Sequence, residues 1–223
     1  MTAAEARAQL ETTIRQAHER GDLEGAATAA LSGYGPEILG FLVGVLRDDE
    51  VASEAFSQFA EDLWKGLAGF AWRCSFRTWA YTLARHASAR LLREPTRRRE
   101  RRLETGEVSK LAEEVRENTL TYLKTEVKRG VDALRAQLTP EERELLILRV
   151  DRQLGWADIA EVLAADEEPK KAAAALRKRF ERVKVRLRDL AVAEGLIEAA
   201  GTRGGSPRAT SVPGSERNPK EGS

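Results

Sequence analysis

Cysteine and histidine are scarce in this chain, and their scarcity excludes several kinds of chemistry. Among 223 residues there are one cysteine, Cys74, and two histidines. A single cysteine excludes an internal disulfide and a thiolate cluster for zinc. The sequence also lacks an HExxH stretch and a glycine-rich phosphate loop, which supply the usual ligands for metals and nucleotides. We therefore expect no cofactor, no metal site, no catalytic residue and no enzymatic activity.

Long apolar runs are missing as well. No run of 18 apolar residues occurs, so we predict no transmembrane helix and no membrane insertion. The N-terminal stretch MTAAEARAQLETTIRQ carries charges throughout and has no apolar core of a signal peptide. From these two features we predict a cytoplasmic protein.

An overall excess of one charge is also lacking, but charge is concentrated locally. Against 37 Lys and Arg stand 36 Asp and Glu, a net charge of +1. Six acids and no base lie between Asp48 and Asp62, whereas seven bases and one acid lie between Arg177 and Arg188. These local blocks, more than the total, indicate where partners would bind.

The stretch FRTWAYTLARHASARLLR, residues 76–93, contains no Gly or Pro and predicts one continuous helix. Ser75 precedes it as a candidate N-cap. An apolar stripe with helical spacing predicts a core face: Phe76, Trp79, Ala80, Leu83, Ala87 and Leu91. Another face carries Arg77, Tyr81 and Arg85, with His86, Arg90 and Arg93 beside it. A basic face with an aromatic suits nucleic acid, while an ordinary core helix with solvated arginines remains the alternative.

The segments around this helix predict a helical N-terminal unit. Residues 2–30 indicate a helix broken near Gly21 and Gly25, either a mobile arm or the first helix of the domain. We expect a turn at Gly33–Pro36 and an acidic helix at 51–67. Residues 69–74 indicate a loop with two aromatic residues, whose role is either packing or stacking on a base. The arginine run REPTRRRERR at 93–102 is either a solvated linker or a phosphate contact.

The C-terminal part predicts a second helical unit. Thr139, Pro140 and Glu142 form a capping box with proline at the first helical position. Residues 156–163 predict a short amphipathic helix, and a long basic helix begins near Lys170. This order is the outline of a helix-turn-helix, whose second helix would enter the major groove; a three-helix bundle with a charged surface is the alternative. Residues 201–223 are rich in Gly, Ser and Pro and predict a disordered tail.

Together these motifs resemble a small two-domain sigma factor of bacterial RNA polymerase, the extracytoplasmic-function type. GFAWRCSFRTWAYTLARHASARLLR is similar to the loop and promoter-reading helix of sigma region two, and Glu54 and Gln58 keep the spacing of the polymerase-binding helix. LTPEERELLILRV, LGWADIAEVL and AALRKRFERVKVRLRDL are similar to region four. The resemblance covers about residues 30–192.

The resemblance implies an all-α fold of two helical domains on a flexible linker. A region two-like domain would span 26–94, a linker 95–128, a region four-like domain 129–195 and a disordered tail 196–223. The implied partners are core RNA polymerase, through its beta-prime coiled coil and beta flap, and promoter DNA; an anti-sigma factor is a further candidate. The implied function is promoter-specific initiation of transcription.

The implied site residues fall into three sets. Those surrounding the opened minus-ten strand are Phe70, Trp72, Trp79, Tyr81, Arg85, His86 and Arg90. Those reading the minus-thirty-five duplex are Arg177, Lys178, Glu181 and Arg182. Those binding the polymerase are Glu54, Gln58, Glu61 and Asp62.

The sequence departs from the family at three points. His86 stands where the family usually has Asn, an acidic residue is missing near Ala89, and ADEEPKK is inserted before the basic helix. The departures at His86 and in the inserted turn favour, as an alternative, a helical interaction protein that mimics a sigma factor. A stand-alone helix-turn-helix regulator is a further alternative, but it leaves the acidic helix at 51–67 without a role.

Overall fold

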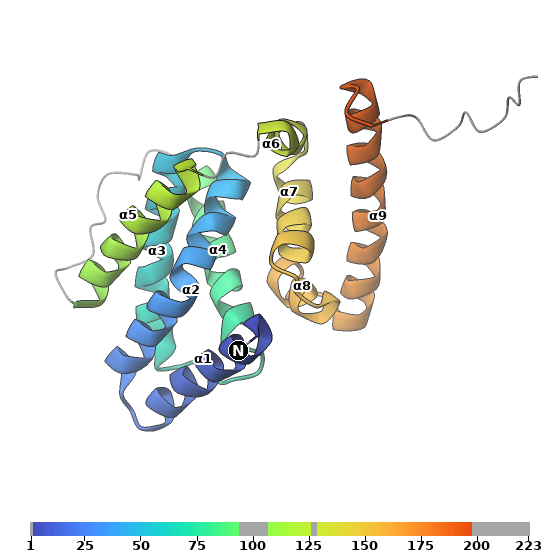
Figure 1. Cartoon of the computed structure of the whole chain (residues 1–223). Coiled ribbons are helices and arrows are strands. Elements are labelled where there is room, and N and C mark those ends of the chain that lie inside the picture. The colour runs from blue at the N-terminus through green and yellow to red at the C-terminus, as the bar shows by residue number, and fades with distance from the viewer. Residues whose placement is uncertain (1, 94–106, 126–128, 198–223) are drawn as a thin grey trace, which may run out of the picture.

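The computed structural model describes residues 2–93, 107–125 and 129–197, and of residues 107, 121–125 and 129–132 it describes the backbone only. Every regular element within these ranges is a helix, so the predicted all-α class is confirmed. Figure 1 shows the helices in two groups, α1–α5 on one side and α6–α9 on the other. We call them the N-terminal group and the C-terminal group.

The first two helices are α1 (Ala3–Glu19) and α2 (Leu23–Leu46). The predicted break falls at Gly21, whose φ of 75° favours a residue without a Cβ, and Asp22 caps α2. Since α1 buries Ile14 and Ala17 against this group, it is the first helix of the domain. The predicted turn at Gly33–Pro36 is wrong, because α2 continues through both residues.

Close packing at its glycines explains why α2 remains helical although Pro36 lies inside it. A proline inside a helix costs about 3 kcal/mol. In return, α2 packs closely on its neighbours: a Cβ on Gly33 would lie 2.3 Å from Leu10 Cδ2, and one on Gly44 2.8 Å from Ile147 Cδ1. We infer that burial along α2 outweighs the cost of Pro36.

Helix α2 is the central helix of the molecule and contacts α1, α3, α4, α5 and α7. By length and composition it is the one described helix that could cross a membrane. Half of its most apolar window is buried inside the protein, and its fully buried side chains include Leu31, Leu39 and Phe41. Here it serves as a core helix.

Helices α3 (Asp49–Leu67) and α4 (Phe76–Arg93) lie where the sequence predicted them. The N-terminus of α4 is capped twice: Ser75 Oγ accepts a bond from the N–H of Thr78, and the carboxylate of Glu11 accepts bonds from the N–H groups of Phe76 and Arg77. The second cap reaches over from α1. It fixes the start of α4 relative to that helix, since a carboxylate at a helix N-terminus also stabilises the helix dipole.

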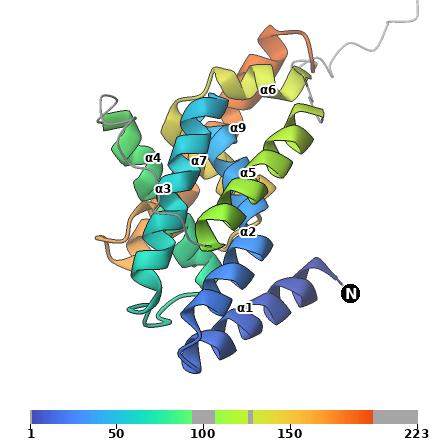
Figure 2. The ribbon, with the colours of Figure 1, turned by 90° about the vertical axis from the view of Figure 1, so that its left-hand side faces the viewer.

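Helix α5 (Glu107–Thr125) lies inside the predicted linker 95–128. It packs along α2 and α3 (Figure 2), with Val108, Leu111 and Val115 against the core. A flexible linker is therefore not confirmed for this part of the chain, because the spacing of these apolar side chains gives the helix a core face. Residues 94–106, with most of the arginine run, lie outside the described residues.

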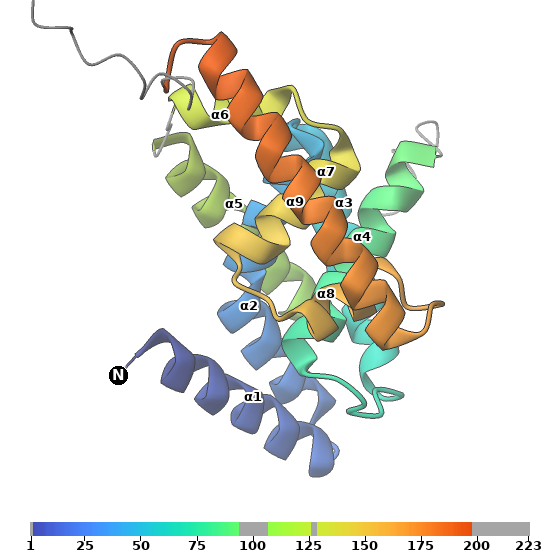
Figure 3. The ribbon, with the colours of Figure 1, turned by 90° about the vertical axis from the view of Figure 1, so that its right-hand side faces the viewer.

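The C-terminal group contains α6 (Arg129–Ala136), α7 (Pro140–Leu146), a π-helical turn η2 (Ile147–Asp151), α8 (Trp156–Leu163) and α9 (Pro169–Ala193). The predicted capping box is confirmed, with Thr139 and Glu142 bonding reciprocally. In the view of Figure 3, helix α9 lies in front of the other helices. The predicted tail 196–223 lies almost wholly outside the described residues; only Leu196 and Ile197 are described, and both are exposed.

The two groups share one hydrophobic core. Side chains from α2 and α4 belong to the same buried cluster as those from α7 and α8, and α4 contacts α8 while α2 contacts α7 and η2. The predicted arrangement of two separate domains on a flexible linker is not what these residues show. The N-terminal group also starts before residue 26, since α1 belongs to it.

Candidate nucleic-acid interface

Helices α8 and α9 pack on one another and are joined by residues 164–168. Ile159 and Ala160 of α8 are buried, and the ring of Trp156 packs edge-on against Phe180 of α9, with 5.6 Å between centroids. Arg177 lies over the same indole at 5.9 Å. A short buried helix thus supports a longer helix whose other face is open.

The exposed face of α9 carries the four residues expected to read duplex DNA: Arg177, Lys178, Glu181 and Arg182. Seven cations lie between residues 177 and 188, and of these only Arg179 is half-buried. A row of exposed guanidinium and ammonium groups along one helix is the pattern that attracts DNA phosphates. The structure therefore places this predicted set together on one accessible surface.

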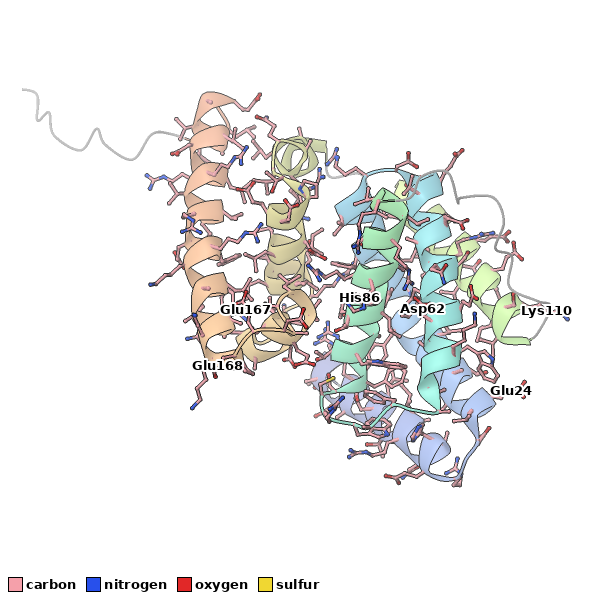
Figure 4. All side chains as sticks on the ribbon, turned by 180° about the vertical axis from the view of Figure 1, so that it is seen from behind. Glu24, Asp62, His86, Lys110, Glu167 and Glu168 are labelled. Carbon is pink, nitrogen blue, oxygen red and sulfur yellow. The ribbon has the colours of Figure 1, made fainter. Side chains whose placement is uncertain are left out.

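The inserted residues ADEEPKK lengthen α9 as well as the turn. Glu168 caps the helix by accepting bonds from the N–H groups of Lys170 and Lys171, and Pro169 takes the first helical position. Glu167 and Glu168 mark this turn in Figure 4. Both lysines are exposed at the first turn of α9, the end that usually approaches base edges. The sequence analysis did not include them, although Glu168, Pro169 and the lysines form a recognisable helix start.

Tyr81 does not present in this structure the exposed ring that stacking on a base requires. Its side chain is fully buried and packs edge-on against Phe41, with 5.2 Å between centroids. The phenol donates a 2.6 Å bond to Oε1 of Glu37. Burial, and secondarily Glu37, raises the pKa of Tyr81 far above its ordinary value. Glu37 on α2 thus satisfies the buried hydroxyl of Tyr81. The spacing of residues within α4 does not reveal this partner.

The C-terminal group contacts both ends of the row Arg77–Tyr81–Arg85. A terminal nitrogen of Arg77 donates to the carbonyl of Arg152 at 2.7 Å, and the same side chain bonds to Glu37. At the next residue along the chain, the hydroxyl of Thr78 donates to Asp158 of α8 at 2.9 Å. These contacts occupy the face of α4 that the sequence suggested for DNA.

Arg85 is engaged at the same junction. Its Nε lies 3.4 Å from Oε1 of Glu144 on α7. Burial raises the pKa of Glu144, and the Arg85 cation opposes that rise. Arg85 is thus placed between the groups in this structure, and its side chain is only partly exposed.

His86 and Arg90 lie on the exposed side of α4, next to α3 (Figure 4). Arg90 bonds to the carboxylate of Asp62. Partial burial lowers the pKa of His86, and the neighbouring Arg85 and Arg90 cations lower it further. A neutral imidazole, able both to donate and to accept, is therefore the favoured form at pH 7.

The aromatic residues of the 69–79 segment form one cluster. The rings of Phe70 and Trp79 stack at 4.5 Å, and Phe70 is buried. Trp72 is half-buried, with a φ of 55°. Phe70 and Trp79 are thus packing residues here, whereas Trp72 borders a hollow of about 180 Å³ between the loop and α1.

Trp72 is held by α1. Its Nε1 donates to Nδ1 of His18 at 3.3 Å, and Nε2 of His18 lies 2.9 Å from the carbonyl oxygen of Leu67. The guanidinium of Arg15 lies 4.6 Å from the centre of the indole. His18 therefore fixes the loop, a role that sequence analysis missed because 54 residues separate it from Trp72.

The expected polymerase-binding residues form a polar row on α3: Glu54, Gln58, Glu61 and Asp62. All four are partly exposed. Nε2 of Gln58 donates to Glu61 at 3.3 Å and to Asp62 at 3.1 Å, and Lys65 pairs with Glu61. Gln58 thus joins Glu61 and Asp62, and Asp62 links the row to α4 through Arg90.

No group of three or more His, Cys, Asp or Glu side chains within the described ranges is arranged to hold a metal ion. Cys74 is half-buried, and that burial raises the pKa of its thiol. Comparison of the chain with models of known protein families gave no match, and comparison with curated protein sequences gave none either.

Proposed function

We propose that the protein is a sigma factor that binds core RNA polymerase and directs it to particular promoters. The proposal rests on one combination: a helix-turn-helix with an exposed basic second helix, in the same chain as a helix with a partly exposed acidic row. The first element suits duplex DNA, and the second suits a basic protein surface. The sequence resembles sigma regions two and four, and in a sigma factor these two elements serve one function.

In this proposal α9 reads the upstream element as duplex. Arginine pairs with guanine and glutamate accepts from cytosine N4, so Arg177, Lys178, Glu181 and Arg182 are the base-reading candidates, and Lys170 and Lys171 are added at the first turn. His86, Arg90 and Trp72 hold the opened minus-ten strand. Glu54, Gln58, Glu61 and Asp62 bind the polymerase.

The contacts between α4 and the C-terminal group set a requirement on this function. Promoter opening by Arg85 and its neighbours needs the C-terminal group to move away from α4. Polymerase binding could supply the energy for that movement, because a partner shifts a conformational equilibrium by its differential affinity for the two states.

The experiment is transcription in vitro with purified core polymerase, with and without this protein, on a library of promoter fragments. Discrete transcripts that depend on the protein and share an upstream motif would support the proposal. Polymerase binding without any transcript would instead favour a protein that mimics a sigma factor, the candidate suggested by the covered face of α4. Duplex binding without polymerase binding would favour a stand-alone regulator.

A further inference from the structure

His18 uses both nitrogens of its ring at the loop between α3 and α4. Nε2 lies 2.9 Å from the carbonyl oxygen of Leu67, so this nitrogen carries the proton and donates the bond. Nε1 of Trp72 can only donate, and it donates to Nδ1 of His18 at 3.3 Å. The two partners therefore select the neutral imidazole with its proton on Nε2, because an imidazolium has no nitrogen left to accept the bond from the indole.

The surroundings of this imidazole favour opposite charge states. His18 lies in the last turn of α1, and Leu67 is the last residue of α3, so two helix C-termini favour a cation here. The indole N–H of Trp72 and the guanidinium of Arg15, which lies 4.6 Å from the centre of that indole, both oppose a second proton. Protonation of His18 would therefore strengthen the bond to the carbonyl of α3 and remove the bond from Trp72.

Other charged groups on the surrounding elements have less influence on this exchange. On α1, at the cap of α2, on α3 and on the loop they are Glu11, Glu19, Arg20, Asp22, Lys65 and Arg73. All except Glu11 are exposed, so water screens their charges. The carboxylate of Glu11 is engaged by Tyr34 and by the N–H groups at the start of α4. The hydrogen bonds of the ring itself therefore dominate.

Trp72 is placed to move once the bond to His18 is lost. Its φ of 55° lies in the left-handed region, which is strained for a bulky side chain and persists only where contacts hold it. Its indole is half-buried and borders the hollow of about 180 Å³ that Arg15 and Cys74 also line. Loss of the bond removes a contact that offsets the strain, and the hollow offers space for another orientation of the ring.

We propose that His18 is a positioning residue that holds Trp72 toward the opened strand, and that protonation of His18 releases the indole. Helix α1 thereby becomes a proton-sensitive part of strand recognition. Histidine changes its charge between about pH 5 and 8, so opening should weaken as the pH falls through that range. The contact between Trp72 and the strand rests on the proposed function, whereas the release of Trp72 does not.

The release is measured by NMR on the full chain, without polymerase or promoter. The indole N–H resonance of Trp72, assigned with Trp72→Phe, is followed from about pH 8 to about pH 5 beside the ring resonances of His18. We expect both to change with one midpoint. In His18→Gln, which keeps a donor and an acceptor but does not titrate, the Trp72 resonance should stay at its high-pH position. In His18→Ala it should stay at the released position.

Strand opening tests the positioning role. Permanganate reactivity of unpaired thymines, with core polymerase bound, should fall at least about fivefold for the wild type relative to His18→Gln between about pH 8 and 6, the size of one lost base–aromatic stack. His86→Asn, which exchanges the other histidine, is the control and should keep this fall because His18 still titrates. Binding of the upstream duplex through α9 should be the same for the wild type and His18→Gln at every pH.

Two results would overturn the release: a Trp72 resonance that does not follow the charge of His18, or one that shifts equally in His18→Gln. Opening that does not differ between the wild type and His18→Gln, in a protein that does direct transcription, would overturn the positioning role. If the protein directs no transcription, the sigma-factor proposal fails, while the resonance of Trp72 still decides the release.

Discussion

Arg85 on α4 and Glu144 on α7 form an ion pair across the junction of the two helical groups, with 3.4 Å between Nε and Oε1. The Glu144 residue is only 8% exposed, while 34% of the Arg85 side chain is open to solvent. The buried carboxylate of Glu144 therefore needs Arg85 to compensate its charge, whereas the cation of Arg85 is also solvated by water. This asymmetry decides how the two partners respond to mutation.

Charge reversal at this pair should destabilise the protein. Arg85→Glu leaves two carboxylates facing one another, and we expect a loss of about 1–3 kcal/mol in the free energy of unfolding. Glu144→Arg should cost a similar amount, and combining both should recover part of the loss because the pair is restored in reverse. Urea denaturation measures each value.

The matched control is reversal of Glu113 and Arg116, an ion pair within α5, which should change stability by less than about 0.5 kcal/mol. Strict additivity of the Arg85 and Glu144 substitutions would contradict an interaction between them.

Glu144 should also give the protein a specific pH dependence. Its folded-state pKa is raised above the ordinary 4.5, so the folded protein holds the proton more tightly than the unfolded chain. This contribution to stability is complete below about pH 4.5 and is lost as the pH rises through the raised pKa. Glu144→Gln should therefore gain stability relative to the wild type across that window, and parallel stability curves would refute this.

Gly33 is a close-approach position between α2 and α1. An added Cβ would lie 2.3, 2.7 and 3.1 Å from three atoms of the Leu10 side chain. Gly33→Ala should thus displace Leu10 and cost about 1–2 kcal/mol, even though alanine favours helix by about 1 kcal/mol. The control is Gly69→Ala, where the nearest atom to the added Cβ would be 3.7 Å away, and this variant should leave the Tm unchanged. Equal stability of the two variants would show that α1 shifts to accommodate the added Cβ at no cost in stability.

The sigma-factor proposal predicts a division of labour between α9 and α4. Arg182→Ala should weaken binding to the upstream duplex by about 1–3 kcal/mol and leave strand opening nearly intact. His86→Ala should do the reverse, and His86→Asn should retain opening. Permanganate reactivity of unpaired thymines across minus-ten variants reports on opening. Loss of duplex binding in His86→Ala, with opening unchanged, would remove His86 from the strand-binding set.

The acidic row of α3 should govern binding to core polymerase. Because Asp62 also holds Arg90 of α4, Glu54→Lys with Glu61→Lys is the cleaner reversal. It should weaken core binding at least about tenfold, since opposing charges at an interface become like charges. Glu24→Lys with Glu114→Lys, on exposed positions of α2 and α5, is the control, and an equal effect in both doubles would exclude a specific surface.

Much of the local structure could be predicted from the sequence. The helix at 76–93, the capping box at Thr139 and the amphipathic helix from Trp156 follow from periodicity and cap residues, which act over a few positions. Gly33–Pro36 was misjudged because the same residues that favour a turn also permit close helix packing. The helical spacing of Val108, Leu111 and Val115 is enough to predict a core face, but the polar residues around them suggested a linker.

The sequence by itself determined the helical class, the positions of α3, α4, α8 and α9, and the charge that each of these helices carries, because these depend on neighbours along the chain. Only the tertiary structure decided which charges are free. Arg85 and Tyr81 share a helix with His86, yet Glu144 and Glu37, both distant in sequence, engage the first two and leave the third at the surface. Likewise His18 and Trp72, 54 positions apart, meet through one hydrogen bond. The physical reason is that burial and pairing depend on contacts between distant segments, which no local spacing encodes.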